Sequence, residues 1–156
     1  RLIYVARLER TETHCEPSAV HCSGVMFSAD GGLNWGGELD DGHLLDPRCK
    51  STVAKMTTST GQEVLVYTGA LSDQMGARVN ITCLFSEDGK LWGNPRIVLP
   101  ALDVAGQSQI GGYSAVQPLP GASGYAGVVL EAQLPPKYDL AIVFAKIDAP
   151  VFGVSV

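Results

Sequence analysis

The sequence has few charges, and most of them are acidic. Charged residues make up 17% of the 156 residues, and the formal net charge is −5. A chain with this balance has no general attraction to nucleic acid or to anionic membranes, so an anionic ligand requires a local cluster of arginines. The chain also lacks an apolar run long enough for a transmembrane helix. No signal peptide is visible, and we interpret the start of the chain as a mature or truncated N-terminus.

Helical periodicity is missing as well. No stretch of useful length repeats apolar residues at helical spacing, and 18 glycines and nine prolines indicate many turns. Hydrophobic residues make up 46% of the chain, which is enough for one domain with a sizeable core. Short runs that favour strands recur along the whole sequence, and we therefore predict an all-β fold. The predicted strands are 2–8, 24–27, 51–56, 63–67, 78–85, 96–99, 113–119, 124–131, 140–147 and 151–156.

The predicted strand 78–85 shows the clearest alternation. Ile81, Cys83 and Phe85 fall on one side, whereas Arg78 and Asn80 fall on the other. Asn80 also begins an Asn-Ile-Thr sequon for N-glycosylation. A glycan on the same strand face as Arg78 would crowd any site built around that arginine.

Only four cysteines are present, and they are Cys15, Cys22, Cys49 and Cys83. They allow three disulfide pairings, among which the sequence does not decide. Cys15 and Cys22 are close enough to staple a small loop, as in secreted proteins. Each follows a histidine (His14 and His21), so a metal site is the alternative, but a second cysteine pair at zinc-finger spacing is missing. We therefore expect a loop bridge, with no metal and no other cofactor.

Two similar turn sequences, Ser28–Trp35 and Ser86–Trp92, each follow a strand-like run. Asp30 can accept hydrogen bonds from backbone N–H groups of its own turn, the glycines permit positive φ, and Trp35 can pack the turn onto a sheet. The second copy is one residue shorter, so we expect its turn to be distorted. The alternative is two unrelated β-turns that happen to contain the same residue types.

Both turns resemble the pattern Ser-x-Asp-x-Gly-x-Thr/Asn-Trp, the Asp box found between outer strands of sialidase-type β-propeller blades. The resemblance implies a six-bladed propeller, of which the chain would cover roughly the last three blades at about four strands each. Residues 1–156 would then form the C-terminal part of one propeller domain, with the remaining blades N-terminal to it or on another chain. The box positions have a structural role and are Ser28, Asp30, Gly32 and Trp35 in the first copy and Ser86, Asp88 and Trp92 in the second.

Further segments are similar to sialidase sequences and follow one another in the family's order. Residues 78–86 resemble Arg-x-Asn-Leu-Thr followed by a box serine, 112–116 and 127–131 resemble Tyr-Ser-x-Leu and Leu-Tyr-Glu, 4–7 resemble Asn-Ala-Arg, and 46–47 match an Asp-Pro that follows a box. The order looks closest to that of the lysosomal type. The chain departs from the pattern at Val5, where the family has Asn, and at Leu130, where it has Tyr.

The resemblance implies an exo-α-sialidase that hydrolyses terminal sialic acid from glycoconjugates, with Tyr113 as the nucleophile. Arginine forks bind the carboxylate of sialic acid bidentately, and Arg7 and Arg78 correspond to the second and third of the family's three arginines. Glu131 corresponds to a carboxylate that holds an arginine in place. A neutral phenol is not repelled by the substrate carboxylate, and sialidases use a tyrosine for this reason. The family's Glu base and Asp acid/base have no counterpart here, so we expect the isolated chain to be inactive.

Two other classes of protein share these turns. One is a sialic-acid-binding lectin without catalytic carboxylates, and the other is a structural Asp-box propeller. Tyr113 also has a plain interpretation as a strand tyrosine, Arg78 as a salt-bridge partner and Glu131 as an exposed strand-end carboxylate, and Arg10 is an alternative to Arg7. The expected partner is a sialylated glycoconjugate and not nucleic acid, and the expected location is lysosomal or secreted.

Overall fold

The computed structural model describes residues 2–7, 23–37, 44–47, 49–72, 78–100, 111–134 and 139–150. This part of the chain is all-β, as predicted, and none of its residues forms a helix that could cross a membrane. Nine of the ten predicted strands have a counterpart, and the tenth, 151–156, lies outside the described residues. The strands are β1 (Leu2–Arg7), β2 (Ser23–Ser28), β3 (Thr52–Thr57), β4 (Glu63–Ala70), β5 (Ile81–Ser86), β6 (Gly93–Leu99), β7 (Gly111–Pro118), β8 (Tyr125–Leu134) and β9 (Asp139–Asp148).

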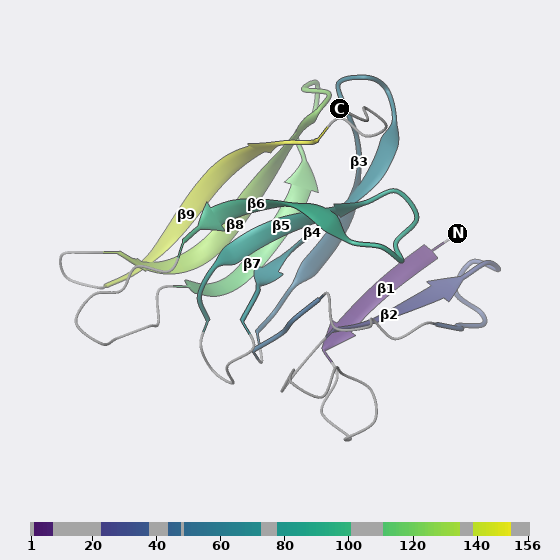
Figure 1. Ribbon diagram of the computed structural model, residues 1–156, viewed down its shortest axis with the longest axis horizontal. Helices are drawn as coiled ribbons and strands as arrows, with labels where there is room; N and C mark the ends of the chain where they lie inside the picture. Colours follow the sequence, from purple (N-terminus) through teal and green to yellow (C-terminus); the bar gives the residue numbers. More distant parts are fainter. Residues whose placement is uncertain are drawn as a thin grey trace.

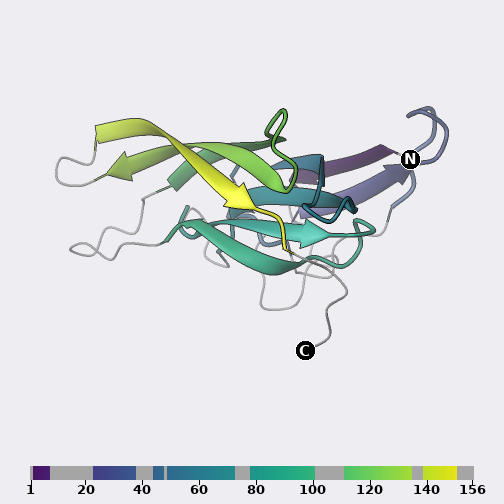
Figure 2. The same cartoon turned by 90° about the horizontal axis from the view of Figure 1, so that it is seen from above.

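The strands form three antiparallel sheets in which neighbours in sequence are neighbours in space (Figure 1). β1 pairs with β2, β3 to β6 form a four-stranded meander, and β7 to β9 form a three-stranded meander. Viewed from above, β7–β9 and β1–β2 lie at opposite sides, with β5 and β6 below them (Figure 2).

The two central strands of the four-stranded sheet, β4 and β5, are buried on both faces. The larger core joins the sheet to β7–β9, and a smaller core joins its other face to β1–β2. Along β4, Val64 and Val66 belong to the larger core, whereas Leu65 and Tyr67 contact the smaller one. This alternation follows from the two-residue period of a strand, and here both faces are apolar because both are covered.

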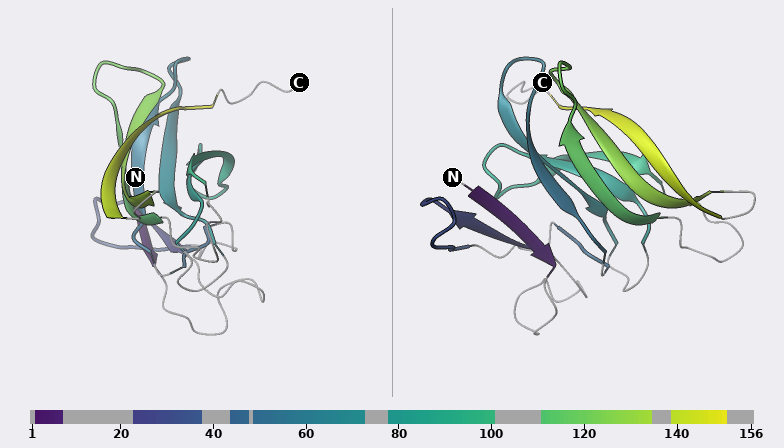
Figure 3. Two further views of the ribbon diagram at one scale, coloured as in Figure 1. Left: turned by 90° about the vertical axis from the view of Figure 1, so that its left-hand side faces the viewer. Right: turned by 180° about the vertical axis from the view of Figure 1, so that it is seen from behind.

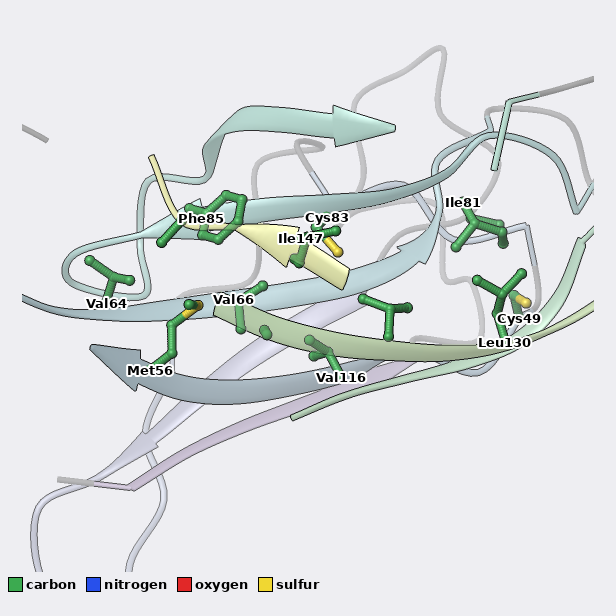
Figure 4. Packing of buried hydrophobic residues seen from close by; sticks show 14 of the residues in the cluster. Cys49, Met56, Val64, Val66, Ile81, Cys83, Phe85, Val116, Leu130 and Ile147 are labelled. Carbon is green, nitrogen blue, oxygen red and sulfur yellow. The ribbon is translucent and has the colours of Figure 1, made fainter. Parts of the chain in front are cut away.

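The larger core runs along the length of the strands. In Figure 4, Cys49 and Ile81 lie towards one end of it, and Met56, Val64 and Phe85 lie towards the other. Ile81, Cys83 and Phe85 all belong to this core, which confirms the alternation predicted for that part of the chain.

The predicted strand 78–85 begins later in the structure, at Ile81. Asn80 has a φ of 54°, a left-handed conformation that interrupts an extended strand. Its carbonyl accepts hydrogen bonds from Leu71 N at 3.3 Å and from Thr82 Oγ1 at 2.8 Å. The expectation that Arg78 and Asn80 share one face of a regular strand is therefore wrong, because Arg78 lies in the segment that leads into the strand.

The first strands of the two meanders lie side by side. Ser114 in β7 donates its N–H to Lys50 O at 3.4 Å, and Thr52 Oγ1 in β3 donates to Ser114 O at 2.9 Å. Seen from behind, β3 stands between β1–β2 and β7–β9 (Figure 3, right).

The contribution of the larger core can be tested by substituting Phe85, whose side chain is only 1% exposed. We expect Phe85→Ala to lower the free energy of unfolding by about 3–5 kcal/mol, through lost burial and the cavity left behind. Ile97 in the same sheet is 63% exposed, and Ile97→Ala should change the free energy by no more than about 0.5 kcal/mol. Urea unfolding measures both, and equal losses would contradict this description of the sheet.

Candidate functional site

The first Asp-box turn is closed by its own side chains. Ser28 Oγ donates to Asp30 Oδ1 at 2.8 Å and accepts a bond from Gly32 N at 2.8 Å. Asp30 in turn accepts Asn34 N at 2.9 Å and Asn34 Nδ2 at 2.7 Å. Gly31 and Gly32 have φ of 75° and 96°, which few residues other than glycine adopt easily. The turn leads to Gly36, which pairs with Phe27 in β2.

The second turn keeps the same scheme over a shorter span. It joins β5 to β6, the last two strands of the four-stranded meander. Ser86 Oγ accepts Gly89 N at 2.8 Å, three residues along instead of four. Asp88 Oδ1 accepts Lys90 N at 2.8 Å and Leu91 N at 3.2 Å. The expected distortion takes the form of a contraction: the bonds to backbone N–H groups span one or two residues fewer, whereas the serine-to-aspartate bond spans two residues in both turns.

The two box tryptophans have different surroundings. Trp35 is 40% exposed, donates Nε1 to Gly32 O at 2.9 Å and meets the edge of Tyr4 at 6.0 Å between ring centroids. Trp92 is buried against Tyr67, with ring centroids 5.9 Å apart. Its Nε1 is buried with no hydrogen-bond partner in the structure as described. The shorter turn therefore buries its tryptophan more deeply but loses the indole hydrogen bond.

The residues predicted to carry chemistry gather at the other end of these strands. The boxes follow the ends of β2 and β5, whereas Arg78 precedes β5. The Arg78 guanidinium carbon lies 5.0 Å from the ring centroid of Tyr113, whose side chain is 44% exposed. Glu131 Oε2 accepts the backbone N–H of Tyr113 at 3.4 Å. The structure thus brings three of the four predicted residues, Arg78, Tyr113 and Glu131, together.

Tyr113 lies on an irregularity of its strand. Gly111 pairs with Ala132 and Ser114 pairs with Leu130, so two residues of β7 oppose the single residue Glu131 of β8. Such a bulge redirects a side chain away from the regular alternation of the strand and is common beside functional sites. A Cβ added at Gly112 would lie 2.6 Å from Glu131 Oε2 and 2.7 Å from Glu131 Cβ, so the carboxylate needs a glycine there.

A buried segment before β3 supports the bulge from behind. Cys49 Sγ donates to Gly112 O at 3.1 Å, and Cys49 N donates to Asp46 Oδ1 at 2.6 Å. Burial raises the pKa of the Cys49 thiol, an effect that the charge of Arg78 opposes and those of Asp46 and Glu131 reinforce. Cys49 and Gly112 were missed by sequence reasoning, which treated the cysteine only as a disulfide candidate.

For Arg7 the structure describes the backbone only. Arg7 ends β1 opposite Ser23, whose hydroxyl donates to the buried Asp46 Oδ2 at 3.4 Å. The Arg7 backbone therefore lies at the same end of the sheets as Asp46 and Cys49, but its side chain is not among the described ones.

Other sequence expectations fall outside the described residues. They concern Arg10, Cys15 and Cys22 and the histidines before these cysteines. Cys49 and Cys83 are both free, so neither of them forms the disulfide bond that the sequence allowed. Within the described ranges, no three His, Cys, Asp or Glu side chains are grouped as metal ligands.

Comparison with known proteins adds no assignment. No model of a protein family matches the chain, and no curated protein is significantly similar to it. The resemblance to sialidases therefore rests on the sequence patterns alone.

The first box generates a pH prediction. Hydrogen bonds from Asn34 N–H, from the Asn34 amide and from Ser28 lower the pKa of Asp30 from 3.8 to about 2. A carboxyl with a lowered folded-state pKa stabilises the fold above its ordinary pKa, and this contribution is lost as the pH falls from about 4 through about 2. An NMR titration of the Asp30 carboxyl should have its midpoint near the lower value, and Asp30→Asn should abolish the matching shift of the Asn34 amide. A midpoint near 3.8 would contradict the hydrogen-bonded turn.

Proposed function

We propose that this chain is part of an exo-α-sialidase that removes terminal sialic acid from glycoconjugates. The observation that carries the proposal is the Arg78 guanidinium held over the ring of the half-exposed Tyr113, with Glu131 bound at the backbone of the same residue. These residues come from three separate segments, and sequence patterns had already assigned them to one site. A lysosomal or secreted location belongs to the same proposal.

The geometry suits a substrate with a carboxylate on its reacting carbon. Arg78 would bind the carboxylate through its fork of N–H donors. The ring of Tyr113 lies beside Arg78, so a sugar bound through that carboxylate would have its anomeric carbon near this side chain. The phenol oxygen would attack this carbon from one face as a base takes its proton, while the aglycone leaves from the other face and its oxygen takes up a proton. Water would then hydrolyse the tyrosyl-linked sugar and return the proton to the phenol.

The sheet arrangement supports a β-propeller as the fold of this enzyme. A propeller blade is a four-stranded antiparallel meander, which is the form of β3 to β6. The first strands of neighbouring blades lie side by side around the propeller axis, as β3 and β7 do through Ser114 and Thr52. The second box joins the two outer strands of its meander, where the sialidase pattern has it. We therefore propose that the three sheets are roughly three blades of a six-bladed ring.

One observation favours a sialic-acid-binding lectin as the second candidate. Glu131 is the only carboxylate that the described residues place in contact with Tyr113, and it binds the backbone N–H and not the phenol. A tyrosine nucleophile needs a base to take its proton. Without that base the arginine and the aromatic ring could still bind a sialoside.

The role of Tyr113 is tested by removing its hydroxyl. In the protein at its natural length, Tyr113→Phe should nearly abolish hydrolysis of a fluorogenic sialoside, because the nucleophilic oxygen is gone while the ring remains. Tyr125→Phe is the matched control, since Tyr125 is also half-exposed and has Lys146 Nζ 3.9 Å from its ring centroid. Turnover in Tyr113→Phe equal to that of the wild type would refute the nucleophilic role.

Arg78→Lys keeps the charge of Arg78 but loses its fork. We expect binding of an unsaturated sialic-acid analogue to weaken by about 1–3 kcal/mol, the scale of lost hydrogen bonds to charged groups. Arg96 lies on β6, where its Nη1 contacts only the neighbouring Pro95 O at 3.4 Å among the bonds described, and Arg96→Lys should not change the affinity. Calorimetry measures both variants. If the wild-type protein binds the analogue through Arg78 but shows no turnover, the lectin is favoured. If Arg78→Lys and Arg96→Lys weaken binding equally, Arg78 has no specific role in the site, and both the enzyme and the lectin proposals fail.

A further inference from the structure

The peptide group between Gly112 and Tyr113 is held at both of its polar atoms. Its carbonyl oxygen accepts the Cys49 thiol at 3.1 Å, and its N–H donates to the Glu131 carboxylate at 3.4 Å. The two partners come from different parts of the fold: Cys49 lies in the segment just before β3, and Glu131 lies in β8. Neither group has to contact a substrate to influence where Tyr113 lies.

This peptide needs such support because it forms the bulge. A bulged residue leaves the regular ladder, so side chains must replace the backbone hydrogen bonds that would otherwise fix its orientation. The Tyr113 ring leaves the strand from this point. A change in the tilt of the peptide would therefore move the ring relative to Arg78, which lies 5.0 Å from its centroid.

Cys49 is itself fixed and protonated. Its N–H is bound to Asp46 at 2.6 Å, and Ser23 of the first sheet donates to the other oxygen of that carboxylate at 3.4 Å. The thiol is 4% exposed, and burial raises its pKa, so it keeps the proton that it donates to Gly112. A series of hydrogen bonds thus connects Ser23 in β2 to the bulge in β7 through Asp46 and Cys49.

We propose that Cys49 and Glu131 are positioning residues that clamp the Gly112–Tyr113 peptide and so set the direction of the Tyr113 ring towards Arg78. The inference rests on the proposed function only where turnover is concerned. The orientation of the ring can be observed without any substrate.

The experiment combines kinetics with a spectroscopic signal from Tyr113. The protein at its natural length is labelled with fluorotyrosine, and the Tyr113 resonance is assigned from its absence in Tyr113→Phe. We expect Cys49→Ala to shift or broaden this resonance and to lower kcat about three- to tenfold, as for one lost hydrogen bond, with KM changed less than about twofold. Cys49→Ser keeps a donor and should recover most of both signals.

Cys83→Ala is the matched control. Cys83 is a second free and fully buried thiol, but it lies in the middle of β5. Its removal should lower thermal stability as Cys49→Ala does, while the Tyr113 resonance and kcat stay at their wild-type values.

Gly112→Ala tests the other half of the clamp. The added Cβ would displace Glu131, so the Tyr113 resonance should move as it does in Cys49→Ala. Gly36→Ala is its control, because a Cβ at Gly36 has no atom within 4 Å.

The outcomes separate the clamp from the proposed function. A Tyr113 resonance and kcat that are unchanged in Cys49→Ala and Gly112→Ala would overturn the clamp, even if Tyr113→Phe is inactive. A resonance that moves in these two variants and not in the controls would support it. If the wild type then shows no turnover, the nucleophilic role fails and the clamp remains.

Discussion

Burial of β4 and β5, the two central strands of the four-stranded sheet, on both faces is the constraint on which the rest of the structure depends. Every residue of β5 is buried, so each of its side chains must fit into the core on its own side of the sheet. Ile81 and Phe85 pack towards β7–β9, and Leu84 packs towards β1–β2. A shift of the register by one residue would exchange the two sets, because side chains alternate between the faces. The double burial thus fixes the segments before the strand, Arg78 included, relative to both neighbouring sheets.

The two ends of the sheets differ in the kind of hydrogen bonds that hold them. At one end, the Asp boxes satisfy backbone N–H groups with their own side chains, those of Ser28, Asp30, Ser86 and Asp88, and their tryptophans pack against other strands. At the other end, hydrogen bonds run between sheets, from Asp46 through Cys49 to Gly112. Self-contained turns tolerate the loss of one residue, as the second box shows. The inter-sheet contacts do not have this freedom, since each depends on the position of another sheet.

The sequence was sufficient for what local chemistry decides and insufficient for what depends on packing. Strand alternation and the capping role of Asp30 could be predicted from local chemistry. The meeting of Arg78 with Tyr113 is a non-local contact, and it was expected only from the resemblance of the sequence to sialidases. The left-handed conformation of Asn80 could not, because asparagine adopts it only where neighbours favour it. The bulge at Gly112–Tyr113 was equally hidden, since it is a mismatch between two strands and not a property of either. Cys49 acquires its role only from the carbonyl that packing brings to it.

The candidate site borders an apolar sheet face that the described residues leave uncovered. Glu131 pairs with Ile142, which is 69% exposed, and Val129 pairs with Phe144, which is 62% exposed. Leu140, 69% exposed, extends the same face of β9. Paired residues of antiparallel strands project to the same side, so Glu131 stands at the rim of this face. An apolar face of this kind is normally covered by a partner or by further chain. In the proposed propeller the next blade would cover it, and the same contact would bring new side chains to Tyr113 and Glu131. Under the proposed function, completion of the site and burial of this face would then be one event, and a base for Tyr113 would arrive with the same contact.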